Sequence, residues 1–160
     1  AQMRLAGLLN SRGRMVKESP LIQMDGKGNP CLKLADGKNL ITLSQSDIDQ
    51  VLLAKGAIRA GIDVLMDYLK VAPQEIDEVL IAGAFGSYML PEHAIHTGML
   101  PDVRLDRIHI LGNAAGTGAR LMLKSGKSRQ EAIALAKRIE YLELTVYPDF
   151  SLFYARGIQA

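Results

Sequence analysis

Two short glycine-rich turns carry the residue types and spacing in this chain that best fit ligand chemistry. The first turn follows a wholly apolar run, Val79–Ala82, and consists of Gly83, Ala84, Phe85, Gly86 and Ser87. Such a run is typical of a strand covered on both faces, and glycine permits backbone angles and close approaches that side chains forbid. A helical pattern begins near Pro91. Strand, glycine turn and helix is the arrangement by which α/β proteins place a ligand at the carboxyl ends of their strands.

The second turn repeats this layout further along the chain. It follows the apolar run Ile108–Leu111, contains Gly112, Asn113 and Gly116, and leads into a helical pattern over Ala114–Leu123. Backbone amides at such a turn and at the helix start would hold a phosphate group. Two turns of this kind in one chain indicate a nucleotide pocket.

Lys55 is a third candidate, because it is a charge in an apolar position. It lies near the middle of the apolar stripe of the strongest helical pattern, Ser46–Lys70. Burying an unpaired ammonium is costly, so its head must reach water, meet a carboxylate or contact a nucleotide's ribose or phosphate. Gly56 and Gly61 make the same helix thin, which favours close packing against the sheet or approach of a ligand.

The histidines make a weaker case. His93 and His96 are three residues apart on a short predicted helix, Pro91–Gly98. Helical zinc pairs are more convincing at four residues apart and with a third ligand identified. We therefore interpret both as surface histidines and predict no metal site.

Composition limits the class of protein. The 160 residues are 48% hydrophobic, enough for one domain with a core, and the net charge of +2 is too small to favour nucleic acid or an anionic membrane. The single cysteine, Cys31, excludes a disulfide framework and fits a reducing cytoplasm. No apolar run approaches the roughly 18 residues that span a bilayer. The chain begins without Met inside a helical pattern, so we expect a fragment of a longer protein.

The elements that would position these residues alternate in type. The patterns predict a helix over residues 2–9, then short strands, the long helix, and strands and helices in turn. The short strands are expected at Met15–Val16, Leu21–Met24, Cys31–Leu34 and Leu40–Leu43. Towards the end we expect a helix at Ser128–Glu140, a strand at Leu142–Tyr147 and an apolar segment at Phe150–Tyr154. This order predicts an α/β fold, a mixed β-sheet with flanking helices.

Two interpretations of the turns compete at this point. In the first, the glycines of Gly112–Gly118 form a G-x-x-x-G-x-G turn that resembles short-chain dehydrogenases and would make this an NAD(P)-binding domain. The late position of the turn, the single strand candidate after it and the absence of a Tyr-x-x-x-Lys pair count against this interpretation. In the second, both turns serve one adenine nucleotide.

The second interpretation is supported by a resemblance. VLIAGAFGSY is similar to the adenosine motif of the superfamily of acetate and sugar kinases, heat-shock chaperones and actin, with Gly83-Ala84 where Gly-Gly is commoner. GNAAGTGA resembles the helix that connects the two lobes of that fold. QSDIDQVLLAKGAIRAGIDVLM, IDEVLIAGAFGSYMLPEHAIHTGMLP and ILGNAAGTGARLML together resemble the C-terminal domain of the reductive activators of corrinoid-dependent methyltransferases. This resemblance extends over nearly the whole chain.

The resemblance implies one actin-like (ribonuclease H-like) lobe over residues 1–160, the adenosine-binding lobe of an ATP-dependent iron–sulfur activator. Such activators reduce cobalt(II) corrinoid proteins to cobalt(I) for methyl transfer in methanogenesis or acetogenesis. The implied cofactors are Mg-dependent ATP in the intact protein and an iron–sulfur cluster outside this chain. The implied partners are the corrinoid protein and the remaining domains of the same polypeptide, and a homodimer stays open.

The resemblance also implies a limit and leaves alternatives. The phosphate loops and the cluster ligands of the family would lie outside these residues, so we expect this fragment alone to be inactive, with no catalytic residue of its own. A docking module for a corrinoid protein with a vestigial nucleotide site, and another kinase or activator of the same superfamily, are the alternatives to be tested.

Overall fold

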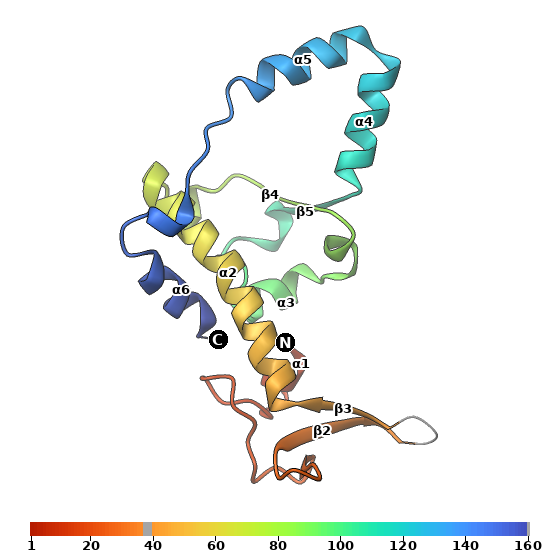
Figure 1. Ribbon diagram of the computed structural model, residues 1–160, viewed down its shortest axis with the longest axis vertical. Coiled ribbons are helices and arrows are strands. Elements are labelled where there is room, and N and C mark those ends of the chain that lie inside the picture. Colours follow the sequence, from red (N-terminus) through yellow and green to blue (C-terminus); the bar gives the residue numbers. More distant parts are fainter. Residues whose placement is uncertain (37–39, 160) are drawn as a thin grey trace.

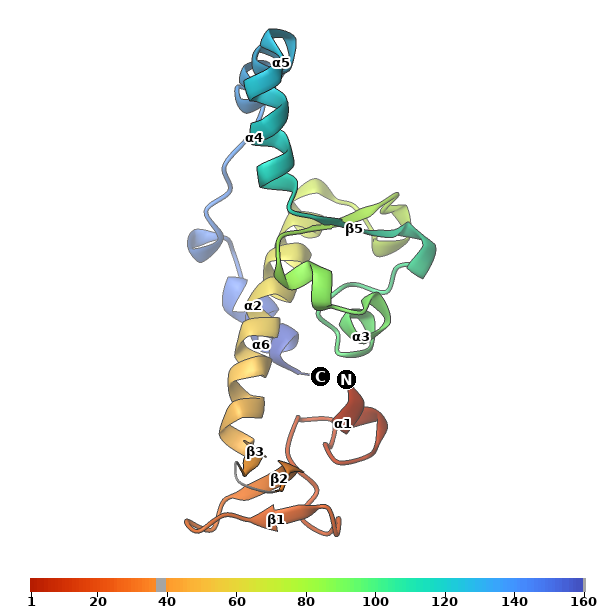
Figure 2. The same cartoon turned by 90° about the vertical axis from the view of Figure 1, so that its right-hand side faces the viewer.

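The computed structural model describes residues 1–36 and 40–159, and it leaves the side chains of Phe85 and Ser87 undescribed. A single long helix, α2 (Gln45–Leu69), forms the axis of the molecule, and the other elements are arranged along it (Figure 1). One small sheet lies at one end of α2, and a second sheet lies beside its other half (Figure 2). The α/β class predicted from the sequence is confirmed, with the strands divided between two sheets.

Helix α2 begins at a well-formed cap. The Ser44 side chain accepts a hydrogen bond from the Asp47 backbone N–H, and the Asp47 carboxylate accepts one from the Ser44 backbone N–H at 2.8 Å. This reciprocal arrangement is a capping box, which satisfies two backbone donors that would otherwise lack partners at the helix start. The helix ends at Lys70, whose left-handed backbone (φ 56°) stops the α-helical pattern.

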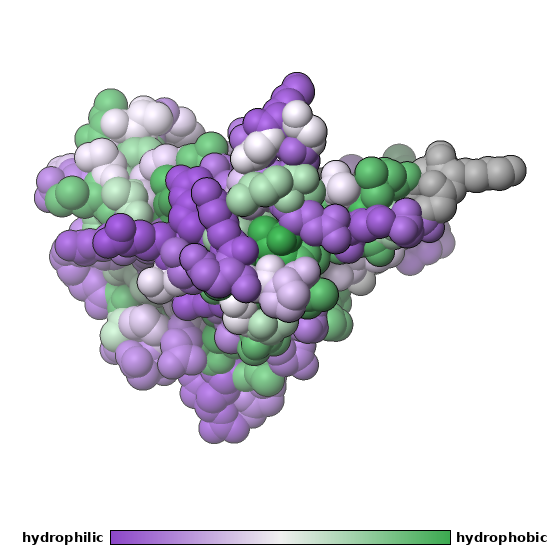
Figure 3. All heavy atoms as spheres, turned by 90° about the horizontal axis from the view of Figure 1, so that it is seen from below, coloured by the Kyte–Doolittle hydropathy of each residue, from purple (hydrophilic) through white to green (hydrophobic). Residues whose placement is uncertain are grey.

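The first sheet is antiparallel and contains β1 (Ile22–Met24), β2 (Pro30–Ala35) and β3 (Ile41–Ser44) in that order. Its strands match three of the four short strands predicted from the sequence, whereas the strand predicted at Met15–Val16 is wrong, since Met15 forms only an isolated bridge to Leu9. Met15, Ile22 and Ile48 form the buried core beneath it, and Cys31 is also buried there. Seen from below, this end of the molecule is covered mostly by hydrophilic residues with small hydrophobic areas between them (Figure 3).

The second sheet is parallel and joins β4 (Val79–Ala82) to β5 (Ile108–Gly112), with Val79 opposite Ile108. Between the two strands the chain forms a 3₁₀ turn at Phe85–Tyr88 and a short helix, α3 (Pro91–His96). A second core packs beneath this unit and consists of Ala94, Leu100, Val103 and Ile108. The crossover places the carboxyl ends of β4 and β5 side by side.

Helices α4 (Ala114–Lys124) and α5 (Gly126–Ala136) follow β5 and form a hairpin that points away from α2 (Figure 1). The sequence predicted α5 over Ser128–Glu140, but the helix starts two residues earlier, at Gly126, and ends four residues earlier, at Ala136. The helix starts at Gly126 because the Ser125 hydroxyl caps it, accepting a hydrogen bond from the Ser128 backbone N–H at 3.1 Å.

The last helix, α6 (Phe150–Ile158), packs along α2. The strand predicted at Leu142–Tyr147 is wrong, because Leu144–Val146 forms a 3₁₀ turn that is capped by the Glu143 carboxylate. The N-terminal helix, α1 (Gln2–Leu5), is also shorter than predicted: it ends before Gly7, whose φ of 69° is left-handed.

The glycines of α2 serve this helix pairing. A Cβ atom added to Gly157 of α6 would lie 2.7 Å from the Gly56 carbonyl oxygen, and one added to Gly56 would lie 2.7 Å from the Ile158 side chain. Gly56 therefore allows close packing of α6 on α2, whereas the sequence suggested close packing of the sheet or a ligand at this position. Across the described part of the chain, the helices are too short or too polar to cross a bilayer.

Candidate functional site

The two glycine turns meet at the carboxyl ends of the parallel strands. The Gly83 backbone N–H donates a hydrogen bond to the Gly112 carbonyl oxygen at 2.7 Å. Both residues have left-handed backbones, with φ of 98° at Gly83 and 60° at Gly112. A Cβ atom added to either would meet nothing within 4 Å, so the space above this glycine pair is open. A flat ligand group could therefore lie directly on the backbone here.

The first turn continues close against its own strand. Ala84 is in the right-handed helical region and is exposed, whereas Gly86 is buried. A Cβ atom on Gly86 would lie 2.6 Å from the Ile81 side chain, so glycine is needed to fold the turn back over β4. The side chains of Phe85 and Ser87, also predicted to contact the nucleotide, lie outside what the structure describes.

The second turn is organised by Asn113. Its side-chain oxygen accepts a hydrogen bond from the Gly116 backbone N–H at 2.9 Å and caps α4. A Cβ atom on Gly116 would lie 2.7 Å from the Asn113 amide nitrogen, so the glycine makes room for the cap. Asn113 thus fixes the start of α4 beside the glycine pair.

Lys55 lies elsewhere and is held by backbone. Only 2% of its surface is exposed, and its Nζ donates hydrogen bonds to the Thr97 carbonyl at 2.8 Å and the Gln159 carbonyl at 3.0 Å. Burial lowers the pKa of this ammonium, and the positive charges of Arg4 and Arg59 lower the pKa further. Within the residues that the structure describes, the head therefore neither reaches water nor pairs with a carboxylate, the two outcomes that the sequence favoured apart from a ligand.

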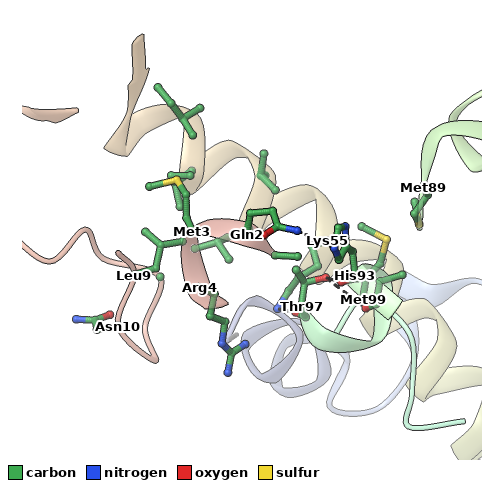
Figure 4. A pocket seen from close by; sticks show the side chains of 17 residues that line it. Gln2, Met3, Arg4, Leu9, Asn10, Lys55, Met89, His93, Thr97 and Met99 are labelled. Carbon is green, nitrogen blue, oxygen red and sulfur yellow. Dashed lines mark hydrogen bonds between the residues drawn. The ribbon is translucent and has the colours of Figure 1, made fainter. Parts of the chain in front are cut away.

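Lys55 also lines a pocket of about 370 Å³ between α1, α2 and α3 (Figure 4). The pocket is apolar, with Met3, Met89 and Met99 among its walls, and none of the residues of the two glycine turns lines it. At its rim the Gln2 amide nitrogen lies 3.1 Å from His93 Nε2. The structure thus brings Gly83, Ala84 and Gly86 together with Gly112, Asn113 and Gly116, and places Lys55 in a separate pocket.

Sequence reasoning missed the acceptors around this pocket. Thr97 and Gln159 act through their carbonyl oxygens, and Arg59 likewise donates to the Gly98 and Leu100 carbonyls at 3.4 and 3.1 Å. Backbone acceptors leave no mark in residue type, so the only available signal was the apolar position of Lys55 itself. Within residues 1–36 and 40–159, no group of three or more side chains of the metal-binding types comes together, His93 and His96 included.

Comparison with known proteins identifies the family. Residues 1–159 match the family described as the C-terminal domain of RACo, the ASKHA domain. The chain is 35% identical over 115 residues to the corrinoid activation enzyme RamQ of Eubacterium limosum, covering 72% of this chain and 19% of that protein. A solved structure of a reductive activator for corrinoid, iron–sulfur protein superposes with a TM-score of 0.86 at 29% identity, over 98% of this chain and 26% of the other.

These matches confirm the resemblance found in the sequence. The chain spans about a fifth of the length of the curated relative and about a quarter of the solved one. The family match extends over both glycine turns, α2 and α6, so the whole described arrangement is that of an actin-like domain. The chain belongs to the family of C-terminal ASKHA domains that RACo represents.

Proposed function

We propose that this chain is the adenosine-binding lobe of an ATP-dependent activator that reduces inactive cobalt(II) corrinoid proteins to cobalt(I). The observation that carries the proposal is the glycine pair, in which Gly83 donates to the Gly112 carbonyl beneath open space. The relatives support it by what their names describe, which is corrinoid activation and the reductive activation of a corrinoid, iron–sulfur protein.

The residues present fit an adenine nucleotide. Gly83 and Ala84 offer a surface free of large side chains for the adenosine. Ala84 has right-handed helical backbone angles, which an alanine adopts without strain, so glycine is not required at this position. Gly112, Asn113 and Gly116 would present the start of α4, whose partial positive charge suits a phosphate. When bound, Mg-ATP would supply the free energy of hydrolysis to a reduction that is otherwise unfavourable.

The electron would come from another part of the protein. A reduced iron–sulfur cluster held there would supply one electron to each cobalt(II) ion, which would give cobalt(I) and a cluster oxidised by one electron. Cys31 is buried in β2, and the chain has no other cysteine. On this proposal the cluster would be held by residues other than those of this chain, in a larger multidomain protein of the cytoplasm.

Filling the space above the glycine pair tests the site. Ala84 is exposed and in a helical backbone conformation, so Ala84→Leu adds bulk there without backbone strain. In the full-length protein we expect this variant to bind ATP at least tenfold more weakly than the wild type, measured by calorimetric titration. Ala57→Leu, an exposed alanine on α2 away from the turns, is the matched control and should bind ATP normally.

Activity tests the rest of the proposal. The full-length protein, supplied with a reductant, should restore an oxidised corrinoid protein to cobalt(I), followed by its visible absorption, only when ATP is present. Equal rates without ATP would contradict the coupling. If the wild-type protein binds the corrinoid protein but does not bind ATP, the alternative of a docking module with a vestigial nucleotide site is the correct one. Unchanged ATP affinity in Ala84→Leu would remove Ala84 from the nucleotide site.

A further inference from the structure

The crossover between β4 and β5 is tied to α2 by an arginine. After α3 the chain forms a turn at residues 97–100, called the crossover turn below. Arg59 of α2 donates from Nη1 to two carbonyl oxygens of this turn, those of Gly98 at 3.4 Å and Leu100 at 3.1 Å. The turn is therefore fixed against α2 through its backbone.

Arg59 is itself held in place by a carboxylate. Its Nε donates to Asp63 Oδ1 at 2.8 Å, four residues further along the same helix, and the two side chains are 26% and 19% exposed. The guanidinium donors lie in one rigid plane, so binding Nε to Asp63 restricts where Nη1 can lie. One planar group thus contacts the helix and the crossover turn at the same time.

The contacts of Arg59 are more local than those of Lys55. Lys55 ties the turn to α6 as well, because it donates to the Gln159 carbonyl. Within the part of the chain that the structure describes, the hydrogen bonds of the Arg59 side chain reach only Asp63 and the crossover turn. A change at Arg59 therefore acts on the crossover without releasing α6.

The crossover turn supports the two strands that carry the glycine pair. Leu100 of the turn is 7% exposed and belongs to the buried core with Ala94, Val103 and Ile108. Ile108 is the first residue of β5, and Ile81 of β4 packs against the same core. A shift of the turn would therefore move the packing beneath both strands, whose carboxyl ends form the glycine pair.

The glycine pair depends on such support because backbone atoms alone form it. Gly83 donates to the Gly112 carbonyl at 2.7 Å, and neither residue has a side chain that could adjust to a ligand. A ligand on this surface meets the backbone where the strands place it. A site of this kind keeps its affinity only if the packing behind it is rigid.

We propose that Arg59 is a positioning residue for the nucleotide site, which acts by holding the crossover turn beneath the strands that end in the glycine pair. This inference rests on the proposed function, which supplies the nucleotide. It uses contacts within the described chain alone, from Asp63 to Arg59, from Arg59 to the turn, and from Leu100 to the core under the strands.

Removing the guanidinium in the full-length protein tests the inference. We expect Arg59→Met to bind ATP at least fivefold more weakly than the wild type, measured by calorimetric titration. Arg14→Met is the matched control, because Arg14 also pairs with a carboxylate of α2, that of Asp49 at 3.0 Å, but lies away from the crossover. It should bind ATP normally, and normal binding by folded Arg59→Met overturns the inference.

A second variant separates position from charge. Arg59→Lys keeps the positive charge, but a single ammonium cannot hold Asp63 and the crossover turn together as the planar guanidinium does. We therefore expect Arg59→Lys to bind ATP more weakly than the wild type as well. Wild-type affinity in Arg59→Lys would show that only the charge matters, and would overturn the inference. If Arg59→Met does not fold, Arg59→Lys carries the same test.

A third variant controls for lost stability. Ile48→Val removes a methyl group from the other core, so it lowers stability without touching the crossover. It should bind ATP as the wild type does. Equal weakening of ATP binding in Ile48→Val and the Arg59 variants would make the effect of Arg59 a general loss of stability, which overturns the inference.

Hydrogen exchange without nucleotide reports on the glycine pair itself. Peptides that contain Gly83 should exchange faster in both Arg59 variants than in the wild type, measured by mass spectrometry, because the bond to Gly112 would open more often. Peptides from β2 should exchange at the wild-type rate. Unchanged exchange at Gly83 in folded variants contradicts the positioning role.

Failure of the proposed function gives a different result. If the wild-type protein does not bind ATP, the proposed function fails and the positioning role falls with it. If the wild type binds ATP and the Arg59 variants bind it equally well, the proposed function stands and only the inference about Arg59 is rejected.

Discussion

Lys55 joins three parts of the chain through one nitrogen atom. It stands on α2 and donates to the Thr97 carbonyl after α3 and to the Gln159 carbonyl after α6. Because both acceptors are backbone carbonyls, the ammonium gains hydrogen bonds but no opposite charge, and burial lowers its pKa. The residue is therefore a structural link whose charge is costly to keep.

Replacing Lys55 by Met tests whether its two hydrogen bonds contribute more to stability than its buried charge costs. Met fills similar volume but leaves two part-buried carbonyls without their donor, so we expect Lys55→Met to lower the free energy of unfolding by about 1–3 kcal/mol. Urea denaturation at neutral pH measures the change. Lys70→Met, at a side chain that is 78% exposed, is the control and should change stability little. If Lys55→Met has the same free energy of unfolding as the wild type, removal of the buried charge offsets the loss of the two hydrogen bonds.

The same variant should remove a pH dependence. Since the folded-state pKa of Lys55 lies below its unfolded value, the unfolded chain binds more protons in the window between the two values. The free energy of unfolding contributed by this group therefore rises with pH through that window, and is lowest below it. The difference in stability between wild type and Lys55→Met should accordingly grow in favour of the wild type as pH rises towards the ordinary lysine pKa.

At the scale of elements, the crossing of α2 and α6 depends on two glycines. Gly157→Ala would place its methyl group 2.7 Å from the Gly56 carbonyl oxygen, which is backbone and cannot move aside cheaply. We expect this variant to lose about 1–3 kcal/mol of stability. Gly61→Ala on the same helix meets only the Leu144 side chain at 3.6 Å, so it should gain about 0.5–1 kcal/mol. Thermal unfolding of the pair measures both, and equal effects would contradict the close crossing.

The sequence predicted where most helices and strands lie better than it predicted which of them pack against one another. Apolar periodicity predicted α2 at Ser46–Lys70, within one residue of the observed Gln45–Leu69 at each end, and the structure shows that Ser44 is its cap. Strands β4 and β5 and their glycine turns were found as short apolar runs between turn residues. The expectation that β4 is covered on both faces is wrong, because Leu80 is exposed in the described structure, as are Ile110 and Leu111 of β5. The strand predicted at Leu142–Tyr147 failed because alternation alone does not supply a partner strand. The packing of α6 on α2 was not predicted. Gly56 indicated that another group lies close to α2, but a small residue does not indicate which element that is.

At the scale of the whole molecule, stability is uneven. The body is held by the two cores and by α6 on α2, whereas α4 and α5 contribute no buried residue. We therefore expect amides of α4 and α5 in the isolated chain to exchange with solvent much faster than those in the middle of α2, measured by mass spectrometry. Equal protection of the two regions would show that the hairpin of α4 and α5 folds back onto the body.

The bond between Lys55 and Gln159 spans 104 positions of sequence, and this separation has a consequence for synthesis. The residues of α2 leave the ribosome long before those of α6. During that time Gly56 and the Lys55 ammonium lack the contacts that α6 and Gln159 provide in the folded chain. The β1–β3 sheet and the parallel pair can each form from local segments in the meantime. Closing α6 onto α2 then completes the body last, because the contacts furthest apart in sequence form only after the intervening chain has been made.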